Sequence, residues 1–260
     1  MQMAQRAVFR TPDGLDIAYE VWERDSKLPT VVLHHGFAAD GNTNWVAPGI
    51  VDALTAAGRR VVTIDARGHG ASSKPHDPLF YGEEKMAADV RTLLDLLGEP
   101  SYDLVGYSMG AIVSALVASQ EPRIRRLVIG GVGASVVELG GVDTRVVGSG
   151  VIQALHTDDP SSITDPNAAA FRMFAEMTGA DRLALAAQVR TLHQKPIALD
   201  DITASCLVLA GDDDPFAGRP DKLADALPDA TLRVLPGDHL SVVRDPDFAK
   251  LIVSFLADTP

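Results

Sequence analysis

Residues 102–118 read YDLVGYSMGAIVSALVA, and this stretch decides how the rest of the chain is interpreted. The apolar run at 102–105 is typical of a buried strand, and the small apolar residues at 111–118 are typical of a helix. Between them, residues 106–110 form a G-x-S-x-G sequence centred on Ser108. A strand, a sharp turn and a helix in this order can present a serine as a nucleophile. The alternative is a serine in an ordinary tight turn, and the remaining chain discriminates between the two.

The composition limits the partners of the chain. Its 260 residues are 46% hydrophobic and 22% charged, as expected for a soluble globular protein. The net charge is -12 and no run of Lys or Arg occurs, which disfavours nucleic acid and anionic membranes as partners. No apolar run reaches the roughly 18 residues of a membrane span, and the N-terminus lacks the apolar core of a signal peptide. We therefore expect a cytoplasmic protein that acts on a small molecule.

A single cysteine, Cys206, lies in an apolar stretch, so we expect a buried structural thiol. It permits no intrachain disulfide, and the sequence contains no Cys/His spacing typical of a metal site. We expect neither a metal nor an organic cofactor.

Strand and helix patterns alternate along most of the chain. Residues 12–14 have the chemistry of a hairpin turn, and Asn44 and Gly58 bound one of the predicted helices. The alternation predicts an α/β fold: a mostly parallel sheet with helices on both faces and ligands bound at the carboxyl ends of the strands. The strand patterns cover residues 7–10, 15–22, 30–34, 61–64, 102–105, 127–130, 206–210 and 232–235, and the helical ones 44–57, 83–97, 111–118, 222–226 and 248–256.

The alternation breaks between about residues 134 and 200, where the pattern turns helical. Asp165 followed by Pro166 is typical of a helix start, and a second helix is predicted over 180–193. We interpret the stretch as an insertion into one α/β domain. The predicted organisation is a core formed by residues 1–133 and 201–260, with a helical cap or lid at 134–200.

A serine hydroxyl is a poor nucleophile, so it needs a base within hydrogen-bond reach and an acid that orients the base. Two loops after apolar strands offer these groups, at 211–215 (GDDDP) and 236–240 (PGDHL). His239 is the only histidine after the insertion and is the predicted base. Spacing alone does not choose the acid among Asp212, Asp213 and Asp214.

Taken together, these segments resemble the α/β-hydrolase superfamily over nearly the whole chain. The resemblance implies a Ser108–Asp214–His239 catalytic triad, with Asp213 as the reserve acid. It also implies an oxyanion hole formed by the backbone N–H groups of Phe37 and Met109. The segments that carry the resemblance are residues 35–37 (HGF), 65–72 (DARGHGAS), 106–110 (GYSMG), 211–215 and 237–239 (GDH).

Other residues of these segments receive structural interpretations. In the loop at 65–72, Asp65, Arg67 and His69 are expected to fix the loop rather than to react. His34 and His35 are expected to shape the turn that forms the oxyanion hole.

The resemblance also narrows the reaction. A serine at the turn argues against the haloalkane dehalogenases and epoxide hydrolases, which use an aspartate. Residues 35–38 (HGFA) lack both the glycine run of the hormone-sensitive-lipase-like esterases and the proline of many cofactor-free haloperoxidase-like members. The leading prediction is hydrolysis of a small or medium, largely apolar carboxylic ester through an acyl-enzyme on Ser108. The expected substrate pocket comprises Phe37, Phe171, Phe174, Met177 and Leu240, although the two phenylalanines and Met177 of the insertion also fit an ordinary helix core.

Several alternatives remain open at the level of the sequence. Within enzymes they are a C–C bond hydrolase of the meta-cleavage type, a lactonase and a thioesterase. Arg172, Arg182 and Arg190 in the insertion are candidates to hold a substrate carboxylate, or are solvated surface residues. From a different class, the chain could be a ligand receptor on a hydrolase scaffold. The sequence does not distinguish a monomer from a dimer.

Overall fold

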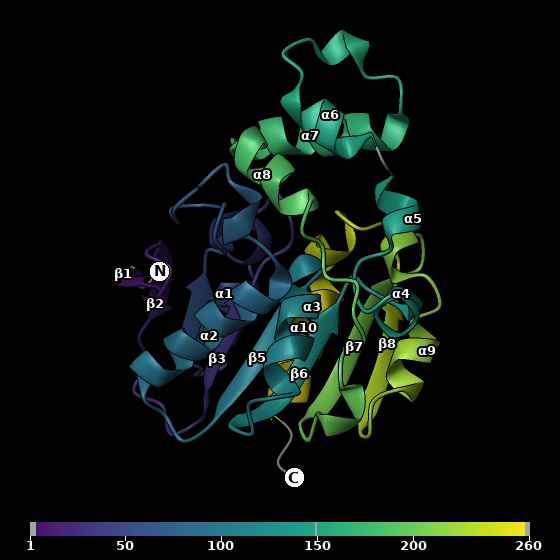
Figure 1. Ribbon diagram of the computed structural model, residues 1–260. Helices are drawn as coiled ribbons and strands as arrows, with labels where there is room; N and C mark the ends of the chain where they lie inside the picture. The colour runs from purple at the N-terminus through teal and green to yellow at the C-terminus, as the bar shows by residue number, and fades with distance from the viewer. Residues whose placement is uncertain (1–3, 149, 258–260) are drawn as a thin grey trace.

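The computed structural model describes residues 4–148 and 150–257 and is built around an eight-stranded sheet of order β1-β2-β4-β3-β5-β6-β7-β8 (Figure 1). Strands β3 to β8 run parallel, whereas β2 is antiparallel to both β1 and β4. This is the mostly parallel sheet that the sequence predicts. The strands are β1 (Gln5–Arg10), β2 (Asp16–Trp22), β3 (Thr30–His34), β4 (Val61–Ile64), β5 (Tyr102–Tyr107), β6 (Ile124–Gly130), β7 (Ser205–Gly211) and β8 (Ala230–Leu235).

Helices cover both faces of the sheet. One face packs against α2 (Glu83–Leu97), α3 (Met109–Ala118) and α9 (Pro220–Asp225), and the other against α1 (Ile50–Ala56) and α10 (Pro246–Ala257). Every residue of β3, β4 and β5 is buried because these strands lie between the two helical layers. The predominance of apolar residues in these strands follows from this position, and the buried Asp103 of β5 is paired with Arg59 and Arg125. Cys206 on β7 is buried, as predicted.

The predicted helix at 44–57 is wrong as a single element. The chain instead forms a π-helical turn, η1 (Asn42–Val46), and α1 begins only at Ile50. Pro48 has no backbone N–H to donate, and Gly49 adopts a φ of 85°, so a regular helix cannot pass through this point. Asn44 therefore does not cap a helix.

The predicted insertion lies between β6 and β7 and is helical. Helices α6, α7 and α8 pack on one another through a small apolar cluster and lie beyond the carboxyl ends of the strands, at the top of Figure 1. Helix α4 instead lies beside α9 (Figure 1). Asp165 caps α7 by accepting hydrogen bonds from two backbone amides, as predicted. The helices are α4 (Ala134–Glu138), α5 (Thr144–Val147), α6 (Val151–His156), α7 (Pro166–Thr178) and α8 (Arg182–Val189).

Short 3-10 turns complete the connections. They are η2 (Pro78–Phe80), η3 (Pro160–Ser162), η4 (Leu199–Asp201), η5 (Pro215–Ala217) and η6 (Val242–Arg244).

None of the helices within the described ranges has both the length and the apolar character that crossing a membrane would require.

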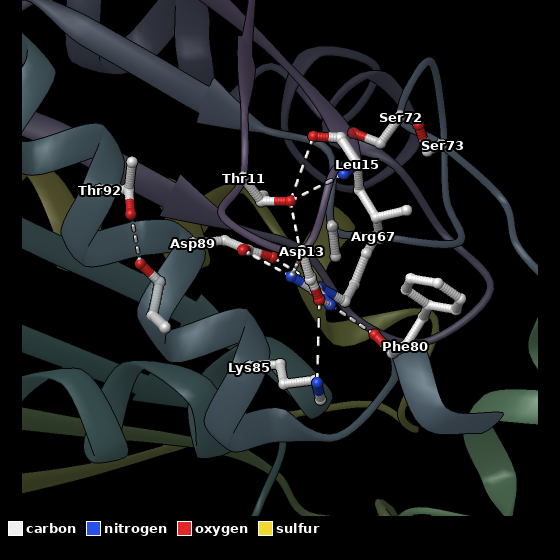
Figure 2. A network of polar contacts seen from close by, with 12 residues as sticks. Thr11, Asp13, Leu15, Arg67, Ser72, Ser73, Phe80, Lys85, Asp89 and Thr92 are labelled. Carbon is white, nitrogen blue, oxygen red and sulfur yellow. Dashed lines mark hydrogen bonds and ion pairs between the residues drawn. The ribbon is translucent and has the colours of Figure 1, made fainter.

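The loop after β4 is held by a buried ion-pair network centred on Arg67 (Figure 2). Its guanidinium donates to both carboxylate oxygens of Asp89 at 2.7 Å and to Asp13 at 2.8 Å. The hydrogen bond from Arg67 lowers the pKa of Asp13 to about 2. Arg67 thus ties the β1–β2 turn, the loop and α2 together, which is the structural role predicted for it.

Candidate active site

Ser108 lies at a strained turn between β5 and α3. Its φ of 54° and ψ of −117° place it in a region that non-glycine residues rarely adopt. A Cβ at Gly106 would overlap the carbonyl group of Gly110, and a Cβ at Gly110 would overlap that of His34. The two glycines are therefore required for the close approach of strand and helix, and Ser108 lines the cavity at this turn.

His239 lies within hydrogen-bond distance of Ser108. Its Nε2 is 3.0 Å from the Ser108 Oγ, and its Nδ1 is 2.8 Å from Oδ2 of Asp214. Asp214 follows β7 and His239 follows β8, so neighbouring parallel strands deliver both residues to the same sheet edge as Ser108. The structure brings together the three side chains that the sequence singled out. This arrangement can move a proton from the hydroxyl to the imidazole and hold the imidazole in one orientation.

The other two aspartates of the 211–215 loop face away from the imidazole. The Asp212 side chain accepts a hydrogen bond from the backbone N–H of Gly237 at 2.8 Å, and Asp213 is exposed. Asp214 is buried, and its second oxygen accepts from the backbone N–H of Phe216 at 2.9 Å. Asp214 is thus the one of the three adjacent aspartates that is buried and bonded to the imidazole, and its role as the acid stays a prediction.

Two aromatic residues that the sequence analysis did not assign hold His239 in place. The Tyr107 hydroxyl donates to the His239 carbonyl oxygen at 2.7 Å, and the two rings are 5.2 Å apart. Phe216 packs on the imidazole with ring centroids 4.7 Å apart. Burial and the charges of Asp214 and Asp238 raise the pKa of Tyr107 well above its usual value, so its hydroxyl remains a donor. Tyr107 occupies a variable position of the G-x-S-x-G sequence, so its contact with His239 could not be predicted from the motif.

The predicted oxyanion-hole amides belong to segments next to Ser108. Met109 is the first residue of α3, and N–H groups in a first helical turn have no acceptor within the helix. The loop carrying Phe37 passes beside the nucleophile, because a Cβ at Gly36 would lie only 3.3 Å from that of Ser108. The side chain of Phe37 lines the same cavity as Ser108.

Buried side chains fix the loop that carries Phe37. The Asn44 Oδ1 accepts from the backbone N–H of Gly36 at 2.8 Å, and the His69 Nε2 accepts from that of Ala38 at 3.2 Å. An imidazole nitrogen can accept only when it carries no proton. Burial lowers the pKa of His69 well below its usual value and that of His34 to about 3, so these rings are neutral. The contacts of His69 and Asn44 with this loop were not predicted from the sequence, and the role expected for His34 and His35 in shaping it stays a prediction.

Ser108 lines a cavity of about 330 Å³ that lies between the sheet edge and the helices of residues 134–200. Four of the five predicted pocket residues line it, namely Phe37, Phe171, Phe174 and Leu240.

Met177 does not line the cavity, and its side chain is 73% exposed. Residues spaced three apart on a helix slip by about 60° per step, so Met177 is turned about 120° away from Phe171. The placement of Met177 in the pocket is therefore wrong.

The three arginines proposed to hold a substrate carboxylate, Arg172, Arg182 and Arg190, do not line the cavity either. Arg172 is buried and donates to Glu176 and to the carbonyl oxygens of Ala154 and Thr157 at 2.6–2.8 Å. Arg182 donates to the carbonyl oxygen of Thr157, and Arg190 is exposed. Arg172 and Arg182 therefore connect α7 and α8 to the end of α6.

The lining of the cavity includes carboxyl groups from Glu83 and Asp238, and among the described residues that form it there is no Lys or Arg. Within residues 4–148 and 150–257, no three His, Cys, Asp or Glu side chains are gathered as a metal site requires.

Several known proteins are similar to this chain in sequence. The family described as alpha/beta hydrolase fold matches residues 29–138. The "sn-1-specific diacylglycerol lipase ABHD11" of Mus musculus is 40% identical over 117 residues, which are 44% of this chain and 36% of that protein. A "2-hydroxy-6-oxo-2,4-heptadienoate hydrolase" of Pseudomonas putida is 38% identical over 115 residues, or 44% of this chain and 41% of that protein. The aligned segments thus span well under half the length of these curated relatives.

Solved structures match over nearly the full chain. A hydrolase from Pseudomonas aeruginosa superposes with a TM-score of 0.76 at 27% identity, covering 97% of this chain and 98% of that one. The enol-lactonase of Burkholderia xenovorans superposes with a TM-score of 0.79 at 23% identity, covering 97% and 100%, and so supports the fold. The chain therefore has the α/β-hydrolase fold: its eight-stranded, mostly parallel sheet superposes on these structures, and residues 29–138 match the family of that description.

Proposed function

We propose that this protein is a serine hydrolase that cleaves a small or medium, uncharged, largely apolar carboxylic ester through an acyl-enzyme on Ser108. The observation that carries the proposal is the hydrogen-bonded series Ser108–His239–Asp214, which opens on an apolar cavity of about 330 Å³. In this proposal residues 134–200 act as the cap over the substrate.

The proposed mechanism uses only side chains and amides of this chain. The Ser108 Oγ attacks the ester carbonyl carbon while the His239 Nε2 takes the hydroxyl proton, and Asp214 stabilises the resulting imidazolium. The oxyanion of the tetrahedral intermediate accepts hydrogen bonds from the Phe37 and Met109 amides. His239 then gives the proton to the departing alkoxide, which leaves as the alcohol. Water, activated by the same imidazole, hydrolyses the acyl-enzyme and regenerates the Ser108 hydroxyl.

The charge of the cavity favours a neutral substrate. The meta-cleavage type of C–C hydrolase is the main rival, and a relative bears such a name. Of the cap arginines that could hold a substrate carboxylate, Arg172 and Arg182 are engaged elsewhere. The charged side chains that line the cavity, Glu83 and Asp238, would repel an anion when ionised. A neutral ester therefore fits the lining better than an acidic substrate.

Steady-state hydrolysis of p-nitrophenyl acetate, butyrate and octanoate tests the proposal. We expect many turnovers per active site, and a loss of about 10⁴-fold or more in kcat in Ser108→Ala. Ser254→Ala on the exposed side of α10 is the matched control and should retain wild-type rates. Stoichiometric stabilisation by ligands with almost no turnover would instead indicate a receptor and would overturn the proposal.

A further inference from the structure

One polar atom in the cavity wall has no hydrogen-bond partner among the residues that the structure describes. Gln188 on α8 lines the cavity and is only 1% exposed. Its Nε2 donates to the Met109 Sδ at 2.8 Å, whereas its Oε1 accepts no hydrogen bond. A buried amide oxygen that accepts no hydrogen bond destabilises the folded protein. The hydrogen bond that it lacks can come from a bound ligand.

A second buried polar group lies in the same wall. Glu83, the first residue of α2, lines the cavity and is 2% exposed. Its Oε2 accepts from the backbone N–H of His193 at 2.8 Å, in the segment that follows α8. Burial raises the pKa of Glu83 to about 7, so near neutral pH much of this carboxyl carries a proton that it can donate.

The remaining lining near these two groups is apolar. Val189 and Leu192 come from the same end of α8 and the segment after it, and Phe171 and Phe174 face the cavity from α7. None of these side chains can satisfy a hydroxyl group. In a mostly apolar pocket a few polar groups set the orientation of the ligand.

We propose that Gln188 and Glu83 form a hydrogen-bonding subsite for a hydroxyl group that the ester substrate carries near its scissile carbonyl. The subsite rests on the proposed hydrolase function. The hydroxyl donates to the Gln188 Oε1 and accepts from the protonated Glu83 carboxyl. The Gln188 amide contacts the side chain of Met109, whose backbone N–H is the proposed oxyanion donor, and on this contact we place the hydroxyl on the same side of the cavity as the scissile carbonyl.

Two matched pairs of esters test the subsite and locate the hydroxyl. Methyl 3-hydroxybutyrate is compared with methyl 3-methylbutyrate, in which a methyl group replaces the hydroxyl of the acyl part. Likewise, 2-hydroxyethyl butyrate is compared with propyl butyrate for the alcohol part. In a pH-stat at pH 6, we expect the hydroxylated ester of one pair to have a kcat/KM about tenfold higher or more. The pair that shows the preference identifies which side of the ester carries the hydroxyl.

Variants of Gln188 test whether the side chain causes the preference. In Gln188→Leu the ratio of the two kcat/KM values should fall to about one. Thermal unfolding should occur at the same or a higher temperature, because the substitution removes an unpaired buried oxygen. Gln188→Met, unbranched and of similar length, provides a second apolar variant. Gln153→Leu, exposed on α6, is the matched control and should keep the wild-type ratio.

The pH dependence of the preference tests Glu83. When the pH rises through 7, the Glu83 carboxyl loses the proton that it donates to the bound hydroxyl. The ratio of the kcat/KM values of the hydroxylated and unhydroxylated esters should therefore change between pH 6 and pH 8 in the wild-type protein. In Glu83→Gln, which keeps an acceptor for the His193 N–H, the ratio should be independent of pH. A ratio that changes equally in both proteins would contradict the part assigned to Glu83.

The outcomes separate the subsite from the hydrolase function. If the wild-type protein hydrolyses both esters of each pair with equal kcat/KM, or if Gln188→Leu keeps a preference, the subsite is refuted while the hydrolase remains. A kcat/KM for methyl 3-ammoniobutyrate higher than that for methyl 3-hydroxybutyrate also refutes the subsite, because it would indicate a site for a cation rather than for a hydroxyl group. If no ester of either pair is hydrolysed, the proposed function itself fails.

Discussion

The Asn44 side-chain oxygen accepts a hydrogen bond from the backbone N–H of Gly36 at 2.8 Å, and this contact links η1 to the loop beside Ser108. Asn44 is buried and lines the cavity. The next residue after Gly36 is Phe37, whose amide is a proposed oxyanion donor. The irregular turn at Asn42–Val46 thus orients an amide that belongs to a different segment.

Substitution of Asn44 should therefore impair the chemical step more than substrate binding. Without its acceptor, the Gly36 N–H is left unpaired and the loop can shift, which misplaces the Phe37 amide. Loss of one oxyanion donor costs about 3 kcal/mol in the transition state, so we expect a fall of about tenfold to 100-fold in kcat for Asn44→Leu. The KM for p-nitrophenyl butyrate should change by about twofold at most.

The exposed neighbour Asn42 supplies the control, since Asn42→Leu leaves the Gly36 contact intact. An unchanged kcat in Asn44→Leu, with the protein folded, would show that the loop does not depend on this hydrogen bond.

The 211–215 loop allows a direct comparison of two neighbouring carboxylates. Asp214 is 2.8 Å from the His239 Nδ1, whereas Asp213 is exposed. We expect Asp214→Asn to lower kcat by about 10⁴-fold, because an amide favours the wrong imidazole tautomer. Asp213→Asn should stay within about twofold of wild type, as surface substitutions usually do. Steady-state kinetics of both variants on one ester gives the answer, and the reverse order would assign the acid to Asp213.

Glu83 should make the stability of the protein depend on pH. Burial raises its pKa from the usual 4.5 to about 7, so the folded state holds this proton more tightly than the unfolded state. This proton stabilises the folded state by about 3 kcal/mol. The stabilisation is complete below pH 4.5 and is lost as the pH rises through 7. Glu83→Gln cannot lose a proton. The unfolding free energy of the variant minus that of wild type should therefore increase by about 3 kcal/mol between pH 4.5 and pH 8.

Urea unfolding of the two proteins at matched pH values measures this difference. The buried histidines also make the unfolding free energy depend on pH, in the opposite direction, because their pKa values are lowered. This contribution is the same in both proteins, so it cancels when the variant is compared with wild type at each pH. A difference that stays constant with pH would mean that Glu83 is not held in a desolvated site.

The parts of the fold that follow local rules could be predicted from the sequence. The strands β3, β4 and β5 are mostly apolar because helices cover both of their faces. The strained turn at Ser108 is signalled by Gly106 and Gly110, because a side chain at either position would collide with backbone. The order of the loops that follow parallel strands is enough to predict that His239 lies near Ser108.

The features that were missed depend on contacts between distant segments. Asn44 has the pattern of a helix cap, but Pro48 and Gly49 break the helix and free its side chain for Gly36. Glu83 and Gln188 lie on α2 and α8, far apart in the chain, and neither belongs to a recognisable motif. That both are buried beside one cavity follows only from how the helices of residues 134–200 pack on the core.

The most direct measurement of the central claim is covalent labelling by a fluorophosphonate probe, followed by peptide mapping of the modified residue. If Ser108 is the nucleophile and His239 its base, we expect one label per chain on the Ser108 hydroxyl, no labelling of Ser108→Ala and strongly slowed labelling of His239→Ala. Labelling at another residue, or labelling of Ser108 at the same rate in His239→Ala, would contradict this assignment.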